Sequence, residues 1–154
     1  MRKKVIAGNW KMNKLPNEAM EFIEGIAPLI KDTNHEVILC VPYIDLFKAM
    51  EMARGTNVKI GAQNVHFEDK GAFTGEISVQ MLEDAGCKYV VMEVSSFALV
   101  QYRIGTSHFK TAVFTNLTQD HLDYHKDMED YFAAKKMLFD VCDTALLNID
   151  DSYG

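Results

Sequence analysis

The stretch EVILCV, at residues Glu36–Val41, is apolar at nearly every position instead of alternating between apolar and polar residues. Strands with this pattern are covered on both faces, which is typical of a parallel sheet. Similar runs recur along the chain, and their first residues lie 21 to 33 positions apart, the spacing of βα units. These other runs are KVIAGN (Lys4–Asn9), NVKIGA (Asn57–Ala62), KYVVMEV (Lys88–Val94), TAVFT (Thr111–Thr115) and TALLNI (Thr144–Ile149).

Amphipathic patterns between these runs predict helices. The first is expected from Pro16, and the last from Met128 with Asp127 as its capping residue. Further helices are expected around residues 44–53, 77–85 and, in short form, 97–104. We therefore predict a single α/β domain over residues 1–154, a three-layer sandwich with a mainly parallel sheet of about six strands. Six strands are too few to close an eight-stranded barrel.

Composition and charge exclude several classes of protein. Of the 154 residues, 48% are hydrophobic and 25% are charged, as in an ordinary globular domain. A formal net charge of −6 argues against nucleic acids and anionic membranes as partners, since both need a basic surface. No apolar run reaches the ~20 residues of a membrane span, and none near the start is long enough for a signal peptide. Cys40, Cys87 and Cys142 are widely spaced and are expected to be reduced thiols, which predicts a cytoplasmic protein.

Polar residues follow most of the expected strands. In α/β proteins the carboxyl ends of parallel strands gather at one edge, where ligands bind. Two interpretations stay open, a functional edge or ordinary polar turns between strands and helices. The residues concerned are Asn9, Lys11, Gln63, Asn64, Glu93, Ser95, Asn116, Asn148 and Asp150.

Three motifs carry a resemblance to a known family. The sequence reads AGNWKMN at Ala7–Asn13, GAQN at Gly61–Asn64 and GAFTGEIS at Gly71–Ser78. These segments resemble triosephosphate isomerase, and the resemblance is continuous over residues 1–91. It implies that Asn9 and Lys11 are the positions that bind the phosphate-bearing substrate.

The resemblance also implies an incomplete catalytic set. The family's reaction removes a proton beside a carbonyl, with a carboxylate base and a histidine electrophile. The histidine position falls on Val94, and the base, the lid loop and the glycine-rich phosphate site belong to the part of the family that the resemblance does not cover. In the family the loop at His66–Glu76 reaches into a neighbouring subunit, so a homodimer stays open.

Residues 88–154 resemble a second family, the UDP-N-acetylmuramoyl-peptide (Mur) ligases of the type that adds the third amino acid. The similarity is to their central ATP-binding domain and rests on MEVSSF, FTNL, DHLDYH and NIDD, which begin at Met92, Phe114, Asp120 and Asn148. It implies metal-binding positions at Glu93 and His121 and nucleotide-binding positions at Asn148 and Asp150. Ligation also needs a G-x-x-x-x-G-K-[ST] loop, and this sequence contains none.

From these resemblances we expect an engineered or recombined chimera without an intact catalytic site, a folded scaffold and not an enzyme. The alternative is a weak phosphate, Mg²⁺ or nucleotide site at the carboxyl edge of the sheet, and residual isomerase or ATPase activity comes last. No cofactor is predicted beyond a weak Mg²⁺ site. If the strands that carry Lys11 and Glu93 become neighbours, an ion pair between these two residues can form at this edge. His121 and His125 would share a helix face suited to a metal, but a solvated loop is the favoured interpretation.

Overall fold

The computed structural model describes residues 3–118 and 124–154. The chain divides into two compact units, Met1–Glu93 and Val94–Gly154, and each is described by itself. The sequence predicted one domain over residues 1–154 with a change of character near residue 91. The change near residue 91 lies close to the boundary between the two units, at Glu93 and Val94. The prediction of a single domain stays a prediction.

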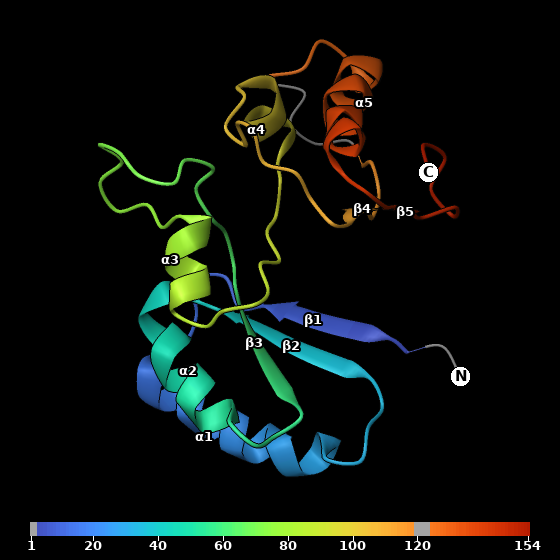
Figure 1. The fold of residues 1–154 in the computed structure, drawn as a ribbon. Coiled ribbons are helices and arrows are strands. Elements are labelled where there is room, and N and C mark those ends of the chain that lie inside the picture. The colour runs from blue at the N-terminus through green and yellow to red at the C-terminus, as the bar shows by residue number, and fades with distance from the viewer. Residues whose placement is uncertain (1–2, 119–123) are drawn as a thin grey trace. The chain divides into compact units, whose positions relative to one another are not determined.

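A parallel three-stranded sheet forms the basis of the first unit (Figure 1). Its strands are β1 (Val5–Asn9), β2 (Glu36–Val41) and β3 (Val58–Ala62), in that order across the sheet. All three were predicted as strands, because runs of β-branched and other apolar residues fit a covered pleated surface. The parallel pairing places the carboxyl ends of the three strands at the same edge.

Helices α1 (Pro16–Ile26) and α2 (Leu46–Ala53) pack together along one face of this sheet (Figure 1). Their buried residues, among them Ile23 and Ala49, join Leu39, Val41 and Ile60 of the strands in one core. Burial of this apolar surface is the main force that holds the layers together.

Helix α3 (Val79–Asp84) follows the long loop after β3. Ser78 caps its start, because the Ser78 hydroxyl accepts a hydrogen bond from the Met81 amide at 3.3 Å. Its end was predicted at Gly86, which adopts a φ of +87° and lets the Gly86 amide bond the Glu83 carbonyl at 2.8 Å.

Residues 88–94, predicted as a fourth strand, form only one isolated parallel bridge, Ala62 with Val90. Two backbone hydrogen bonds hold this segment to β3: Ala62 donates to the Tyr89 carbonyl at 2.9 Å, and Val91 donates to the Ala62 carbonyl at 3.0 Å. The segment lies close to Gly61, where the missing side chain leaves room for the Tyr89 backbone. The apolar run is therefore docked on the sheet without extending its ladder.

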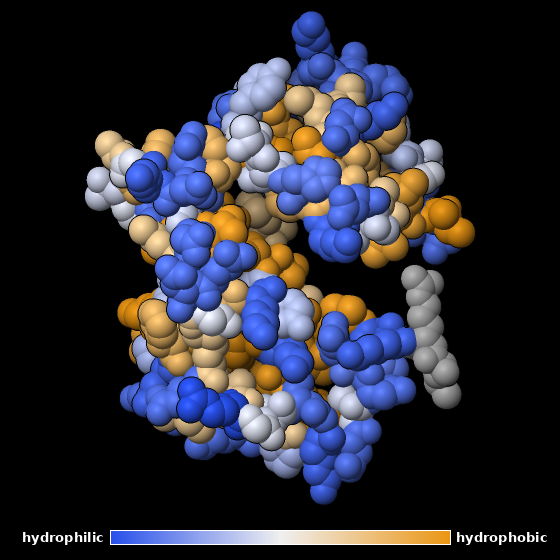
Figure 2. Space-filling view, viewed as in Figure 1, coloured by the Kyte–Doolittle hydropathy of each residue, from blue (hydrophilic) through white to orange (hydrophobic). Residues whose placement is uncertain are grey.

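The second unit contains α4 (Ser96–Val100), β4 (Ala112–Phe114), α5 (Met128–Lys136) and β5 (Ala145–Leu147). β4 and β5 form a separate parallel pair in which Val113 lies opposite Leu146. Phe114 of β4, Leu117 and Tyr131 of α5 make a small core in this unit. Figure 2 shows an orange surface over β5, where Leu146 and Leu147 are about half exposed.

The predicted α/β class and the parallel pairing of βα units are confirmed, and the described strands form no closed barrel. The six-stranded three-layer sandwich is not confirmed, since the described part of the chain holds five strands in two sheets. Local apolar runs are enough to predict where strands form. Which strands pair in one sheet depends on segments far apart in the sequence, so the pairing is harder to predict. Within the described residues no helix has the length and apolar character to cross a membrane.

Substitution of Asp127 tests the predicted start of α5, which begins at Met128 as expected. The Asp127 carboxylate accepts a hydrogen bond from the Asp130 amide at 2.8 Å. We expect Asp127→Ala to lower the free energy of unfolding by about 1 kcal/mol, the usual worth of such a cap. Urea unfolding followed by circular dichroism measures the change, and an unaltered midpoint would show that the cap contributes nothing.

Candidate functional site

The carboxyl edge of the three-stranded sheet brings together Asn9, Lys11 and Gln63, which lie on or just after β1 and β3. Glu93, at the end of the segment docked on β3, joins them through Lys11. All four positions were predicted to lie at one edge. Each belongs to the unit Met1–Glu93, so the site is defined within one compact body.

Lys11 has a backbone φ of +54°, in the left-handed region that residues with a side chain rarely adopt. Such a conformation costs about 1–3 kcal/mol and persists only where surrounding contacts enforce it. The Asn9 side-chain oxygen accepts from the Lys11 amide at 2.8 Å, and the Gln63 side-chain amide donates to the Lys11 carbonyl at 2.8 Å. Gln63 also donates to the Cys40 carbonyl at 3.0 Å. Both backbone polar groups of Lys11 are therefore held by side chains of the sheet edge.

The Lys11 ammonium lies 3.2 Å from a Glu93 carboxylate oxygen, which confirms the ion pair foreseen as a possibility. Both side chains are about two-thirds exposed, at 67% and 68%. Exposed ion pairs contribute only about 0–1 kcal/mol, because water competes for both charges. Asn9 supports the same segment, since its side-chain amide donates to the Val91 carbonyl at 3.3 Å. The Lys11 charge is thus available at the surface, on a backbone that is fixed.

Two ionisable groups near this edge, Cys40 and Tyr43, are protonated at neutral pH, and burial raises the pKa of each further. Burial raises the pKa of the Cys40 thiol to about 11, and the nearby Cys87 adds to the effect. Burial, followed by the charges of Glu76 and Cys87, raises the pKa of Tyr43 to about 12. The Tyr43 hydroxyl donates to the Asn64 carbonyl. Neither group is suited to act as a base or nucleophile near pH 7.

The predicted metal and nucleotide positions belong to different parts of the chain: Glu93 lies in the first unit, whereas Asn148 and Asp150 lie in the second. His121 lies outside the described residues. Glu93 contacts Lys11, and among the described residues no three His, Cys, Asp or Glu side chains are grouped to hold a metal ion. Asn148 lies in the second unit, where its side-chain amide donates to the Thr115 carbonyl at 2.8 Å and ties β5 to β4. Asp150 is exposed beside it.

His125 also differs from the favoured interpretation of a solvated loop, because the residue is only 3% exposed. Its Nε2 lies 2.8 Å from the Ser96 hydroxyl, and its Nδ1 lies 3.4 Å from an Asp130 carboxylate oxygen. The ring stacks on Tyr131. Ser, His and Asp are the residue types of a hydrolase triad, but Ser96 is 1% exposed and offers no approach to a substrate. The cluster therefore holds the second unit together.

Sequence reasoning named Gln63 as an edge residue without giving it a role. It also missed the left-handed backbone of Lys11, for which a lysine gives no signal. The one available clue is the pair of polar residues on either side, Asn9 and Asn13, since asparagine side chains often bond the nearby backbone. Asn13 does so here, donating to the Trp10 carbonyl at 2.7 Å.

Comparisons with known proteins point to one family. A family model described as triosephosphate isomerase matches residues 4–95. Triosephosphate isomerase of Clostridium botulinum (strain Loch Maree / Type A3) is 50% identical over 92 residues, which are 60% of this chain and 37% of that protein. The enzyme of Caldanaerobacter subterraneus subsp. tengcongensis is 49% identical over 92 residues, with the same coverage. The chain thus spans little more than a third of the length of these relatives.

A solved structure gives the same result at the level of the fold. The crystal structure of triosephosphate isomerase from Bartonella henselae matches with a TM-score of 0.64 and 26% identity. The match covers 94% of this chain and 68% of that one.

The matches described above give no support to a Mur-ligase segment or a chimera, which stay predictions. One expectation is corrected. The prediction that the chain is only a folded scaffold is wrong, because the relatives and the solved structure that match it are named triosephosphate isomerases. The family model spans 92 of the 154 residues, from 4 to 95 inclusive. The chain therefore belongs to the triosephosphate isomerase family.

Proposed function

We propose that this chain takes part in triose phosphate isomerisation by providing the lysine that binds the substrate. The observation that carries the proposal is Lys11, fixed in a left-handed conformation at the carboxyl edge of the sheet with its ammonium at the surface. Strained backbone of this kind collects at functional sites, where surrounding contacts enforce it. The relatives that match this segment are named for the same substrate class.

The chemistry of Lys11 suits a phosphate-bearing carbonyl compound. A lysine ammonium is a compact charge that binds phosphate, and it also stabilises negative charge that develops on a carbonyl oxygen. Asn9 and Gln63 hold the backbone from which the side chain extends, so the ammonium starts from a fixed position. Preorganisation of this kind lowers the ordering cost of binding.

Glu93 opposes the binding of an anion at the same place. Its carboxylate neutralises the Lys11 ammonium at 3.2 Å, and a phosphate has to displace it or bind beside it. We therefore expect wild-type affinity for glyceraldehyde 3-phosphate on the order of 1 mM, about −4 kcal/mol. The substrate would weaken the Lys11–Glu93 contact as it binds.

Calorimetric titration with glyceraldehyde 3-phosphate tests this function. Lys11→Ala is expected to abolish measurable binding, whereas Glu93→Gln is expected to tighten it roughly fivefold, about 1 kcal/mol for a competing exposed charge. Lys59→Ala is the matched control, because Lys59 is an exposed lysine of β3 and should bind as wild type does. If Lys11→Ala and Lys59→Ala lose affinity for glyceraldehyde 3-phosphate equally, the loss is due to the change in net charge alone, and the proposal is contradicted.

Several predictions at and beyond this site stay predictions. They are the likeness of residues 88–154 to a Mur-ligase ATP-binding domain, a homodimer, and a cytoplasmic location.

The loop at His66–Glu76, which was expected to reach a second subunit, is closed at its base, where the His66 amide donates to the Ile77 carbonyl at 2.8 Å. Phe73 lies on the His66 ring with 4.4 Å between ring centroids and remains 43% exposed.

A further inference from the structure

Two lysines of the short connection between β1 and α1 have a left-handed backbone. Lys11 has a φ of +54° and Lys14 a φ of +75°, and among the described residues that carry a side chain only Tyr102 also has a positive φ. Glycine adopts this conformation freely, whereas the Cβ of a lysine opposes it. Lys11 is held by Asn9 and Gln63. Lys14 therefore needs contacts of its own to keep its conformation.

The charge of Lys14 is also in an unfavourable place. Lys14 lies two positions before Pro16, where α1 begins with Leu15 as its N-cap. The amino end of a helix carries a partial positive charge, because its first amides lack partners within the helix. The local backbone and the helix dipole thus both disfavour a lysine at this position.

Two aromatic rings hold the Lys14 side chain. Its ammonium lies 5.6 Å from the centroid of the Trp10 ring and 5.2 Å from the centroid of the Phe22 ring. The two rings meet edge to face, with 5.4 Å between their centroids and 83° between their planes. Both ammonium distances are within the range of about 6 Å over which an aromatic ring attracts a cation. One ammonium therefore joins Trp10, the residue directly after β1, to Phe22 of α1.

Trp10 connects this contact to Lys11. The Trp10 amide donates to the Cys40 carbonyl at 3.0 Å, and the Trp10 carbonyl accepts from the Asn13 side chain at 2.7 Å. Because Lys14 also holds the ring, Trp10 is fixed at its amide, its carbonyl and its side chain. The Lys11 amide belongs to the same planar peptide group as the Trp10 carbonyl, so the Lys11 backbone starts from a fixed plane.

We infer that Lys14 is a positioning residue that keeps Lys11 in its left-handed conformation by holding the Trp10 ring against α1, an inference that rests on the proposed function. Lys14 would not touch the substrate, since its ammonium is engaged by the two rings. Arginine carries the same charge and stacks on aromatic rings, whereas glutamine is uncharged. Lys14→Arg should therefore preserve the arrangement, and Lys14→Gln should release it.

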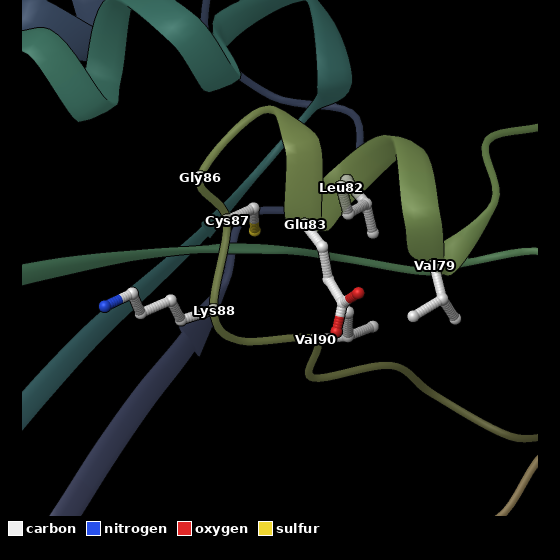
Figure 3. A pocket seen from close by; sticks show the side chains of 7 residues that line it. All are labelled: Val79, Leu82, Glu83, Gly86, Cys87, Lys88 and Val90. Carbon is white, nitrogen blue, oxygen red and sulfur yellow. The ribbon is translucent and has the colours of Figure 1, made fainter.

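Hydrogen exchange at the Lys11 amide tests this role without a ligand. We expect this amide to exchange about tenfold faster in Lys14→Gln than in wild type, and at the wild-type rate in Lys14→Arg, because local opening determines exchange. The reference is the Cys87 amide at the end of α3 (Figure 3), which donates to the Leu82 carbonyl at 2.9 Å. An equal increase at both amides in Lys14→Gln would show a general loss of stability, and no increase at Lys11 would show that Lys14 does not hold it. Either result would overturn the inference.

Trp10 provides a second signal, because it is the only tryptophan in the sequence. Without an ammonium over the ring, quenching of its fluorescence by acrylamide should rise about twofold in Lys14→Gln but not in Lys14→Arg. Phe22→Leu removes one of the two rings, so Lys14→Gln should have a smaller effect on the Lys11 amide in that background. Unaltered quenching in Lys14→Gln, or effects of the two substitutions that simply add, would contradict a shared contact.

Affinity for glyceraldehyde 3-phosphate relates this role to the proposed function. Lys14→Gln should weaken binding about fivefold, whereas Lys14→Arg should bind as wild type does. Lys88→Gln is the control for the lost charge, because Lys88 is an exposed lysine of the same unit whose side chain points away from Glu83 (Figure 3). Equal weakening in Lys14→Gln and Lys88→Gln would contradict a positioning role. If wild type does not bind glyceraldehyde 3-phosphate, the proposed function fails, whereas exchange at the Lys11 amide still decides whether Lys14 holds Lys11.

Discussion

Gly61→Val is expected to destabilise the unit Met1–Glu93 by about 1–3 kcal/mol, the range found when atoms are forced into a packed interior. A Cβ at Gly61 would lie 3.0 Å from the Tyr89 carbonyl oxygen and 3.1 Å from the Tyr89 Cβ. It would also lie 3.4 Å from the Cys40 sulfur. Backbone atoms cannot rotate away as a side chain does, so the whole segment 88–93 has to move. Glu93 would then separate from Lys11.

Gly8→Val is the matched control for this substitution. Gly8 lies in β1 of the same sheet, and a Cβ there has no atom within 4 Å. Valine also favours strands over glycine, so this variant should be as stable as wild type or slightly more stable. Urea midpoints measure stability, and the triose phosphate titration reports on Lys11. Equal loss of stability in the two variants would show that strand glycines matter here for a reason other than close packing.

Asp45→Asn is expected to raise the free energy of unfolding at pH 7 by about 1–3 kcal/mol, because it removes a buried charge that lacks a partner. Asp45 is fully buried at the start of α2, and neither carboxylate oxygen accepts a hydrogen bond from the described residues. Burial, together with the charge of Glu18, raises the pKa of this carboxyl above its ordinary value of 3.8.

The sign of the pH dependence follows from that raised pKa. The folded state favours the protonated carboxyl, so the Asp45 contribution to stability is complete below pH 3.8 and is lost as pH rises through the folded pKa. The advantage of Asp45→Asn over wild type should therefore grow from pH 4 to pH 7 in urea unfolding experiments. Asp32→Asn, a change at an exposed carboxylate, provides the control. An advantage that is constant over this range would contradict the assignment to Asp45.

Local features of this chain were predictable from sequence because their causes are local. The Asp127 cap and the start of α5 at Met128 depend on residues within one helical turn. β2 begins and ends at the predicted residues, since its apolar run is bounded by polar and turn-forming neighbours. The segment 88–94 has the same apolar character and still forms one bridge only. Its strand pairing depends on distant partners, which composition alone does not reveal.

The candidate site likewise has some features that the sequence predicts and others that it does not. The pairing of Lys11 with Glu93 could be foreseen as a possibility, because both residues lie at the carboxyl ends of β-rich runs that meet at one edge. The left-handed backbone of Lys11 depends on Gln63, a residue far along the chain, and could not be predicted from the neighbouring sequence. The sequence gives no sign that Asp45 is buried, and its lack of a hydrogen-bond partner among the described residues is known only from the structure.

The contacts of Lys11 also determine how far the chain can be shortened from its carboxyl end. A piece that ends before residue 63 would lose the amide that holds the Lys11 carbonyl. One that ends before residue 93 would keep the backbone conformation but lose the ion pair. The shortest piece that retains all of these contacts ends at Glu93, which is also the last residue of the first compact unit. Truncation after Glu93 should therefore leave Lys11 in the arrangement it has in the whole chain.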